Sequence, residues 1–391
     1  MFVDDTMGEL VDITGSDPVT GSWQHKAFIP APLGSDEPPI SGGTYRMVAA
    51  AGRALAALDA TVQQLPNPYL LRTPSLRREA QSTSALEGTY APLHEVLTAD
   101  DAPATAEMTE ILNYVRMANT GFLWAQEGRP ITLSLIEDLQ GELMRGTPLE
   151  SASGRLRDSQ VMIGRRPGAH SAAPVHASRF VPVPPGDPLR AGVRALVDWL
   201  HQDHAGDIDP IITAGMAHYQ FETLHPFQDG NGRLGRFLIV LTLLSSGVLS
   251  EPTLTVSPWF EERRAEYYDA LLRVSTHGDW DTFLAFFSQG LAAAATSTRH
   301  QMLALAAAHQ SLKETVRASS LRSVHALDLV DFAVANPSFT VRKVEAALGI
   351  SYGRANGLVA QLTDIGVLDV VETSSQPRRF AAPAVLKVLL S

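Results

Sequence analysis

The chain has 391 residues, with 31 Lys and Arg against 42 Asp and Glu, so its formal net charge is −11 at pH 7. This length suffices for two or three domains with a full core, and the acidic balance argues against generic binding to nucleic acid or to an anionic membrane surface. The absence of cysteine excludes disulfides and thiol catalysis, and we expect a cytoplasmic protein. Residues 1–10 lack the basic and apolar regions of a signal peptide, and the apolar run 238–249 is too short to span a bilayer.

Composition and pattern divide the chain into four parts. Residues 1–43 are rich in Gly, Pro and Asp, and we expect an extended N-terminal arm, with 28–33 docked on the core. The pattern then predicts a helical segment over 44–105, a helical core over 106–310 and a separate C-terminal unit over 319–391. The predicted fold class is therefore mainly α.

A helix with clear end signals is predicted over residues 75–87. Thr73 is a suitable N-cap, Pro74 suits the first helical position, and Gly88 is a suitable C-cap. Glu87 then lies at the negative end of the helix dipole, where an acid is unfavourable unless a cation pairs with it. An exposed, solvated Glu87 is an equally weighted alternative on these residues alone.

A β-hairpin is the one strong β signal in the predicted core. Its first strand is expected over 159–164 and its second around 172–175, joined by the Gly- and Pro-bearing residues 165–168. The first strand contains Val161, Met162 and Ile163.

The most informative stretch is residues 225–236, which read HPFQDGNGRLGR. A helix is predicted over 211–224, and it must end near His225 because the residue before a proline is pushed out of helical geometry. An apolar helix is predicted over 234–249, so residues 231–233 form its opening turn.

That opening turn is suited to binding an anion. The unpaired backbone N–H groups and the dipole at a helix start attract negative charge, and Gly230 and Gly232 let the backbone approach a phosphate closely. Arg233 and Arg236 are three residues apart and share one face of the turn, where positive charge is mismatched to the dipole until an anion binds.

Simpler interpretations exist for each part of this stretch. A His before Pro is usually a loop residue, and an Asp-Gly-Asn-Gly run is usually a turn. His218, Glu222 and His225 also fall at i, i+4 and i+7 and could mimic a zinc site. The zinc interpretation leaves the glycines and both arginines without a role.

The C-terminal unit has the pattern of a winged helix-turn-helix. Its expected elements are helices over 323–335, 340–348 and 351–365, followed by strands over 367–371 and 378–382. Tyr352, Arg354 and Asn356 open the third helix, and Arg378 and Arg379 lie on the wing, as a DNA reader would need. However, residues 319–391 hold seven Lys and Arg against six Asp and Glu, which is a weak basic footprint. Protein contact or dimer packing is therefore favoured over DNA binding.

Residues 225–236 match every fixed position of the signature His-Pro-Phe-x-Asp/Glu-Gly-Asn-Gly-Arg-x-x-Arg, and the chain thus resembles the Fic (Fic/DOC) family. The similarity covers most of residues 45–300, including 218–224, 257–260, 267–271 and 278–280. The resemblance implies an all-helical catalytic core that transfers a nucleoside monophosphate, usually AMP from ATP, to a protein hydroxyl.

The resemblance also implies catalytic and metal-binding roles. His225 would be the general base that takes the proton from the attacking Ser, Thr or Tyr hydroxyl, and a near-neutral imidazole pKa would suit that work. Asp229 would bind Mg²⁺, a hard cation that prefers oxygen ligands and bridges phosphates.

The remaining signature residues would bind the phosphates. Gly230, Asn231 and Gly232 would form an anion cradle from backbone N–H groups and the Asn side chain. Arg233 would hold the β- and γ-phosphates and Arg236 the γ-phosphate, with bidentate geometry. In the family, Lys at the position of Gly232 accompanies phosphotransfer from a reversed ATP, so Gly232 favours AMP transfer.

Two upstream segments resemble regulatory and docking parts of the family. Residues 83–88 resemble its inhibitory motif Ser/Thr-x-x-x-Glu-Gly/Asn, in the subclass whose inhibitory helix precedes the core. Glu87 would then pair with Arg236 and block the γ-phosphate position. The hairpin containing Val161, Met162 and Ile163 resembles the flap that adds a target main chain as a strand, with an ordinary surface hairpin as the alternative.

We therefore expect an autoinhibited protein adenylyltransferase that uses ATP and Mg²⁺ on an unidentified target protein or on itself. Two alternatives stay open. One is removal of AMP from a modified protein, with Glu87 orienting a water, and the other is a nucleotide-sensing transcriptional regulator. A homodimer is a further open expectation, and no membrane partner is expected.

Overall fold

The computed structural model describes residues 2, 6–65, 67, 69–99, 103, 105–166, 168–169, 174–204, 206–372 and 377–391. This part of the chain is mainly helical, with three small antiparallel sheets, which confirms the predicted fold class. Within it, no helix combines the length and apolar character needed to cross a membrane.

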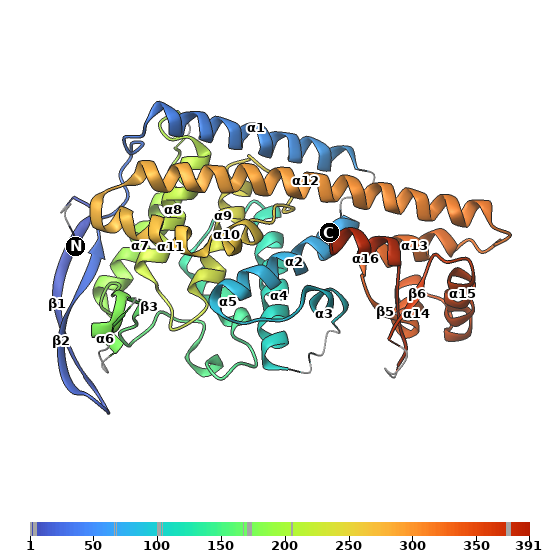
Figure 1. Cartoon of the computed structure of the whole chain (residues 1–391), viewed down its shortest axis with the longest axis horizontal. Helices are drawn as coiled ribbons and strands as arrows, with labels where there is room; N and C mark the ends of the chain where they lie inside the picture. Colours follow the sequence, from blue (N-terminus) through green and yellow to red (C-terminus); the bar gives the residue numbers. More distant parts are fainter. Residues whose placement is uncertain are drawn as a thin grey trace.

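Two long helices lie side by side along one face of the molecule (Figure 1): α1 (Gly42–Gln64) and α12 (Trp280–Ala318). The Asp281 carboxylate at the start of α12 accepts from Ser41 N and Thr44 Oγ1, both at 2.6 Å, which fixes the start of α1. Helix α12 runs on to the C-terminal unit.

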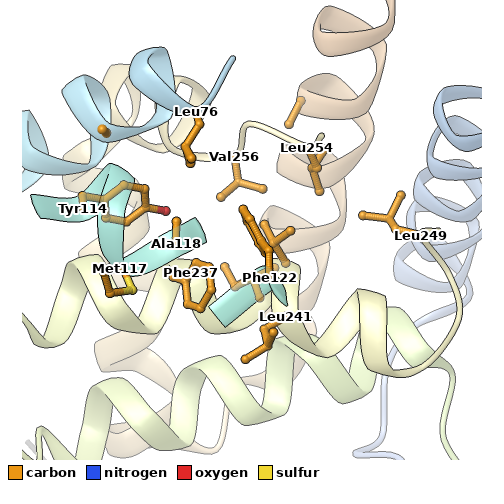
Figure 2. Packing of buried hydrophobic residues seen from close by; sticks show 14 of the residues in the cluster. Leu76, Tyr114, Met117, Ala118, Phe122, Phe237, Leu241, Leu249, Leu254 and Val256 are labelled. Carbon is orange, nitrogen blue, oxygen red and sulfur yellow. The ribbon is translucent and has the colours of Figure 1, made fainter. Parts of the chain in front are cut away.

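The centre of the core is the antiparallel pair α8 (Pro210–Leu224) and α9 (Asn231–Ser245), which were both expected. Almost every residue of both helices is buried, because other helices surround them. Two of these are α4 (Ala106–Gln126) and α5 (Leu133–Leu143). Figure 2 shows Tyr114 and Phe122 of α4 around Phe237 of α9, with ring centroids 6.5 and 5.1 Å from Phe237. Burying such a ring contributes about 1.5–3 kcal/mol, so this packing stabilises the position of α9 against α4.

The helix that carries Glu87 is longer than predicted. It is α2 (Tyr69–Glu87), with Pro74 inside it, so Thr73 is not its N-cap. The preceding turn is held by Leu70, which packs against the core, and by Arg72, whose guanidinium lies 5.1 Å from the Phe122 ring centroid. This packing outweighs the local end signal of Thr73 and Pro74. The helix ends at Glu87 as expected, and Gly88 follows with φ 97°.

The first 43 residues differ from the expected extended arm, because they contain a hairpin of β1 (Gly8–Asp17) and β2 (Gly21–Pro30). Its turn is stabilised by Asp17, whose Oδ1 accepts from Val19 N at 2.8 Å and Thr20 N at 3.0 Å. The Asp and Gly residues that suggested an irregular arm are turn residues. Docking of residues 28–33 is confirmed, since Phe28 is buried and its N–H donates to Val181 O at 2.9 Å.

The second hairpin has the expected place but different strands. β3 (Ile163–Arg165) pairs with β4 (Ser178–Phe180), and the helical turn α6 (Pro174–Ala177) precedes β4. Val161 and Met162 come before β3. The second strand predicted around 172–175 is wrong for residues 174–175, which belong to α6, and residues 172–173 lie outside the described residues. Pro174 explains the shift, because proline suits the start of a helical turn and lacks the N–H that a strand pair uses.

The remaining helices of the core are α3 (Leu93–Thr98), η1 (Glu150–Ala152), α7 (Asp187–Leu200), α10 (Ser257–Glu262) and α11 (Arg264–His277).

The C-terminal unit contains the predicted helices and strands in the predicted order, together with an unpredicted short strand at Phe339–Thr340, and its winged-helix class stays a prediction. Its helices are α13 (Ala326–Ala335), α14 (Val341–Leu348), α15 (Tyr352–Asp364) and α16 (Pro383–Leu389), the last of which was not predicted. Its sheet has the order β5 (Phe339–Thr340), β7 (Arg379–Ala381), β6 (Asp369–Glu372). Helix α13 packs on α2, and Arg78 Nη1 of α2 donates to Leu389 O of α16 at 3.3 Å.

Candidate active site

His225 is the residue that ends α8. Its backbone is left-handed, with φ 49°, and its N–H donates to Phe221 O at 3.0 Å. Its Nδ1 lies 3.3 Å from Glu222 O, and because a carbonyl only accepts, this contact requires the proton on Nδ1. Nε2 is then left with a lone pair. Burial lowers the pKa of His225 to about 4, rather than leaving it near neutral, so the imidazole is uncharged at physiological pH.

The loop between α8 and α9 is fixed by Asn231. Its Oδ1 accepts from Phe227 N and its Nδ2 donates to Phe227 O, both at 2.8 Å, and Phe227 is fully buried. The sequence suggested that the Asn231 side chain binds phosphate, but both of its polar atoms are used within the loop. The backbone N–H groups of the first turn of α9 are the donors that point out of the helix start.

Asp229 and Gly230 form the tip of this loop. Gly230 has φ 84°, a conformation that suits glycine, and its N–H donates to Asp229 Oδ1. The backbone carbonyl of Asp229 accepts from Gln140 Nε2 at 3.0 Å. Among the described residues, Oδ2 of Asp229 has no hydrogen-bond partner, and the side chain is 45% exposed. One free carboxylate oxygen fits Mg²⁺, which is commonly held by one or two carboxylates together with phosphate oxygens and water.

The alternative zinc site is not formed. In the described part of the chain no three His, Cys, Asp or Glu residues are grouped so that they could hold a metal ion. His218 is buried, with Nδ1 3.0 Å from Gly235 O and Nε2 2.7 Å from the Tyr267 hydroxyl. Both of its ring nitrogens are therefore used in the core.

The two signature arginines are buried and each is paired with a carboxylate. Arg233 is 1% exposed, and its Nη1 lies 3.1 Å from Glu110 Oε2. Arg236 is 0% exposed, and its Nη2 lies 2.7 Å from Glu87 Oε1. Arg236 also donates from Nε to Thr83 Oγ1 at 2.8 Å and from Nη2 to Thr83 O at 3.0 Å. The last turn of α2 therefore surrounds Arg236.

Glu87 covers the helix start where an anion would bind. A Cβ atom built on Gly232 would lie 2.0 Å from Glu87 Oε1, so the carboxylate lies directly over the cradle. Burial acts to raise the pKa of Glu87, but Arg236 outweighs it and holds the pKa below its usual value. Glu87 is thus a charged carboxylate at the positive end of α9, which is the position that a phosphate would favour.

A pocket of about 240 Å³ opens beside these groups. It is lined by Glu87, His225 and Gly232 on one side, by Ile163 of β3 and Phe180 of β4 on another, and by Tyr268 of α11. Of the three predicted flap residues, only Ile163 lines the pocket. Val161 and Met162 precede the strand, where Val161 is buried and Met162 is 37% exposed.

Sequence reasoning missed several residues that support the site. Glu79 accepts from Ser257 N at 3.0 Å and from the Ser257 hydroxyl, and burial raises the pKa of Glu79 to about 7. Glu79, Thr83 and Glu87 are four residues apart on one face of α2, a helical spacing that could have identified them. Glu110 accepts from Thr89 Oγ1 at 3.0 Å as well as from Arg233, and nothing local in the sequence indicates it.

Comparisons with known proteins match the part of the chain that contains this site. The Fic/DOC family N-terminal model matches residues 45–123, and the Fic/DOC family model matches residues 130–243. Protein adenylyltransferase fic-1 of Caenorhabditis elegans is 32% identical over 175 residues, which are 45% of this chain and 30% of that protein. Protein adenylyltransferase Fic of Drosophila willistoni is 32% identical over 114 residues, 29% of this chain and 21% of that protein. The alignments thus span less than a third of these relatives.

The fold also matches a solved structure. A Fic family protein from Desulfovibrio desulfuricans superposes with a TM-score of 0.54 and 21% identity, over 88% of this chain and 98% of that chain. At this identity the similarity concerns the fold. It reaches well beyond residue 243, where the second family model ends.

Proposed function

Because the chain belongs to the Fic/DOC family, we propose that it is a protein adenylyltransferase that transfers AMP from ATP to a hydroxyl of a protein and is held inactive by Glu87. The observation that carries the proposal is the position of the Glu87 carboxylate, paired with Arg236 over Gly232 and beside His225 in one pocket. This function needs three parts: a helix start that binds an anion, a neutral imidazole and a carboxylate that can be displaced.

His225 acts as the general base. In its neutral form with the proton on Nδ1, Nε2 accepts the proton of a target Ser, Thr or Tyr hydroxyl. The hydroxyl oxygen then forms a bond to the α-phosphorus of ATP, while the bond from that phosphorus to the leaving pyrophosphate breaks. The buried pair of helices α8 and α9 keeps the base and the cradle in fixed register.

The cradle stabilises the phosphates. Backbone N–H groups of Asn231 and Gly232, in the first turn of α9, face the charge that builds on the transferred phosphoryl group. Arg233 and Arg236 hold the β- and γ-phosphates once their carboxylate partners give way. Asp229 would hold Mg²⁺ through its free oxygen, and the ion would neutralise charge on the pyrophosphate.

Glu87 sets the inactive state. While it pairs with Arg236, the arginine is not free for the γ-phosphate, and two anions in one place repel each other. The target protein is expected to add its main chain along β3, where Ile163 lines the pocket.

Labelled ATP tests the proposal. Chain and lysate are incubated with ATP labelled in the α-phosphate and with Mg²⁺, using wild type, Glu87→Gly and Glu87→Gly combined with His225→Ala. We expect strong labelling of protein by Glu87→Gly only. No labelling by any form would overturn the proposal. Loss of label from a premodified protein without any gain would favour AMP removal, and tight, salt-sensitive binding of a defined DNA site would favour the regulator.

A further inference from the structure

Arg157 is a buried cation whose partners are main-chain carbonyl groups. Its side chain is 4% exposed, and Nε donates to His225 O at 2.8 Å, Nη1 to Ser159 O at 3.0 Å and Nη2 to Val183 O. No carboxylate pairs with it among the described residues. Burial lowers the pKa of Arg157 to about 10, so it is still charged at neutral pH. Burying a charge is costly unless its hydrogen bonds are all made, so these carbonyl contacts must be retained together.

One group of these contacts stabilises the backbone of His225. A residue other than glycine in the left-handed region costs roughly 1–2 kcal/mol, and His225 has φ 49°. Helix α8 ends just before it, with carbonyl groups that lack intrahelical partners. Arg157 Nε binds His225 O, Nη2 lies 3.5 Å from Leu224 O, and the Arg157 N–H donates to Pro226 O at 3.0 Å. Arg157 therefore caps α8 from a distant segment and holds His225 in its unusual conformation.

The other group of contacts fixes both ends of the hairpin β3–β4. Ser159 precedes β3 and Val183 follows β4, and the one guanidinium binds the carbonyl oxygens of both. Two further bonds support the same junction: Gln160 Nε2 to Pro182 O at 2.9 Å, and Ser159 Oγ to Gln228 Oε1 at 2.8 Å. The His225 loop and the hairpin thus meet at one side chain.

We propose that Arg157 is a positioning residue that sets the register between the hairpin β3–β4 and His225, so that a target strand on β3 presents its hydroxyl to the imidazole. The last step rests on the proposed function, whereas the mechanical coupling does not. A lysine cannot replace Arg157 fully, because its single nitrogen cannot reach three segments as the planar fork does.

Amide hydrogen exchange tests the coupling without any catalysis. In Arg157→Met we expect faster exchange both at the His225 and Phe227 amides and at β3 and β4, with Arg157→Lys intermediate. The matched control is Arg299→Met, which removes a partly buried arginine bound to Thr61 Oγ1 at 2.9 Å between α12 and α1. Exchange as in wild type, or loosening of only one of the two segments, would overturn the proposal. If Arg157→Met does not fold, the same comparison is made on Arg157→Lys.

Kinetics in the Glu87→Gly background test the catalytic consequence. A misplacement of about 1 Å can cost about 10²-fold in rate, so the maximal rate of AMP incorporation should fall by about that factor in Arg157→Met. The ATP concentration for half-maximal rate should stay within about twofold, because the phosphate-binding groups are untouched. A rise in that concentration together with an unchanged maximal rate, or full activity in Arg157→Lys, would refute the role. If Glu87→Gly labels nothing, the proposed function fails and the exchange experiment still decides the coupling.

Discussion

The carboxylate of Glu87 lies 2.7 Å from Nη2 of Arg236, and the same oxygen would lie 2.0 Å from a Cβ atom on Gly232. One group therefore neutralises a buried arginine and covers the start of α9. Positive charge at a helix start is unfavourable by about 0.3–1 kcal/mol per residue, and Glu87 offsets this for Arg236 as a bound phosphate would. The chain without nucleotide is thus stabilised by the same groups that the nucleotide would use.

A double-mutant cycle tests this pairing. Glu87→Gly should raise AMP incorporation strongly, because Arg236 becomes free for the γ-phosphate. Arg236→Ala should stay poor with or without Glu87, so the two changes should be clearly non-additive. Incorporation is measured at fixed ATP and Mg²⁺. Equal effects of Glu87→Gly in both backgrounds would mean that the ion pair is structural only.

His225→Ala tests the general base. In the Glu87→Gly background we expect the rate of AMP incorporation to fall by at least about 10²–10⁴-fold, while ATP binding measured by calorimetry is retained. The Gly230 to Arg233 turn does not depend on the imidazole. If the double variant incorporated AMP at the same rate as Glu87→Gly alone, His225 would not be the general base.

The acid dependence of the rate follows from the lowered pKa of His225. The base works only when neutral, and burial lowers its pKa to about 4, so activity should be lost only as the pH falls toward that value. The negative charge of Glu87 raises the pKa of His225, so Glu87→Gly should not move the acid limb upward. A pH–rate profile of Glu87→Gly checks this, and an acid limb near pH 6.5, the usual histidine value, would contradict it.

Asn231→Ala tests the loop rather than the cradle. The change leaves the buried N–H and C=O of Phe227 without partners, which costs about 1–3 kcal/mol for each group. We expect a lower free energy of unfolding by denaturant, together with weaker ATP binding. Gln228→Ala, which removes only an exposed hydrogen bond from Ser159 Oγ to the same loop, should cost no more than about 1 kcal/mol and is the control. A stable Asn231→Ala protein that loses only ATP affinity would instead favour direct phosphate contact.

Glu79 should make stability depend on pH. Burial raises its pKa to about 7, so between its ordinary value and pH 7 the folded chain keeps a proton that the unfolded chain has lost. Stability from this group is therefore present at low pH and falls as the pH rises through that window, by up to about 1.4 kcal/mol per pH unit. Unfolding free energies of wild type and Glu79→Gln at pH 5, 6 and 7 should diverge in this sense, with a flatter profile for Glu79→Gln. Parallel profiles would show that Glu79 is charged throughout.

The parts of the structure predicted well are those with local signals. Pro226 ends α8, the glycines open α9, and Gly88 follows the end of α2, because each acts on its own backbone. The errors came from distant packing. Leu70 and Arg72 extend α2 past Thr73, and the hairpin at residues 8–30 was mistaken for an arm because its turn residues dominated the composition.

The same difference between local signals and distant contacts holds for the site. Two residues of the signature, His225 and Gly232, line the pocket. The signature did not indicate that the Asn231 side chain binds the backbone of Phe227, nor that Arg157 and Glu110 hold His225 and Arg233. Arg157 and Glu110 lie 68 and 123 positions from their partners, and nothing near them in the sequence indicates the contact. Paired residues of this kind are visible only once the chain is folded.

Helix α2 contacts α9 and α10 of the core and α13 of the C-terminal unit, and Arg78 binds the carbonyl of Leu389. Helix α2, which carries Glu87, therefore contacts both the core and the C-terminal unit. Under the proposed inhibitory role of Glu87, a macromolecule that binds the C-terminal unit and favours displacement of α2 would tighten ATP binding, and ATP would tighten the binding of that macromolecule by the same factor. The ATP concentration would then change the affinity of the C-terminal unit for such a partner. The coupling through α2 would act in both directions.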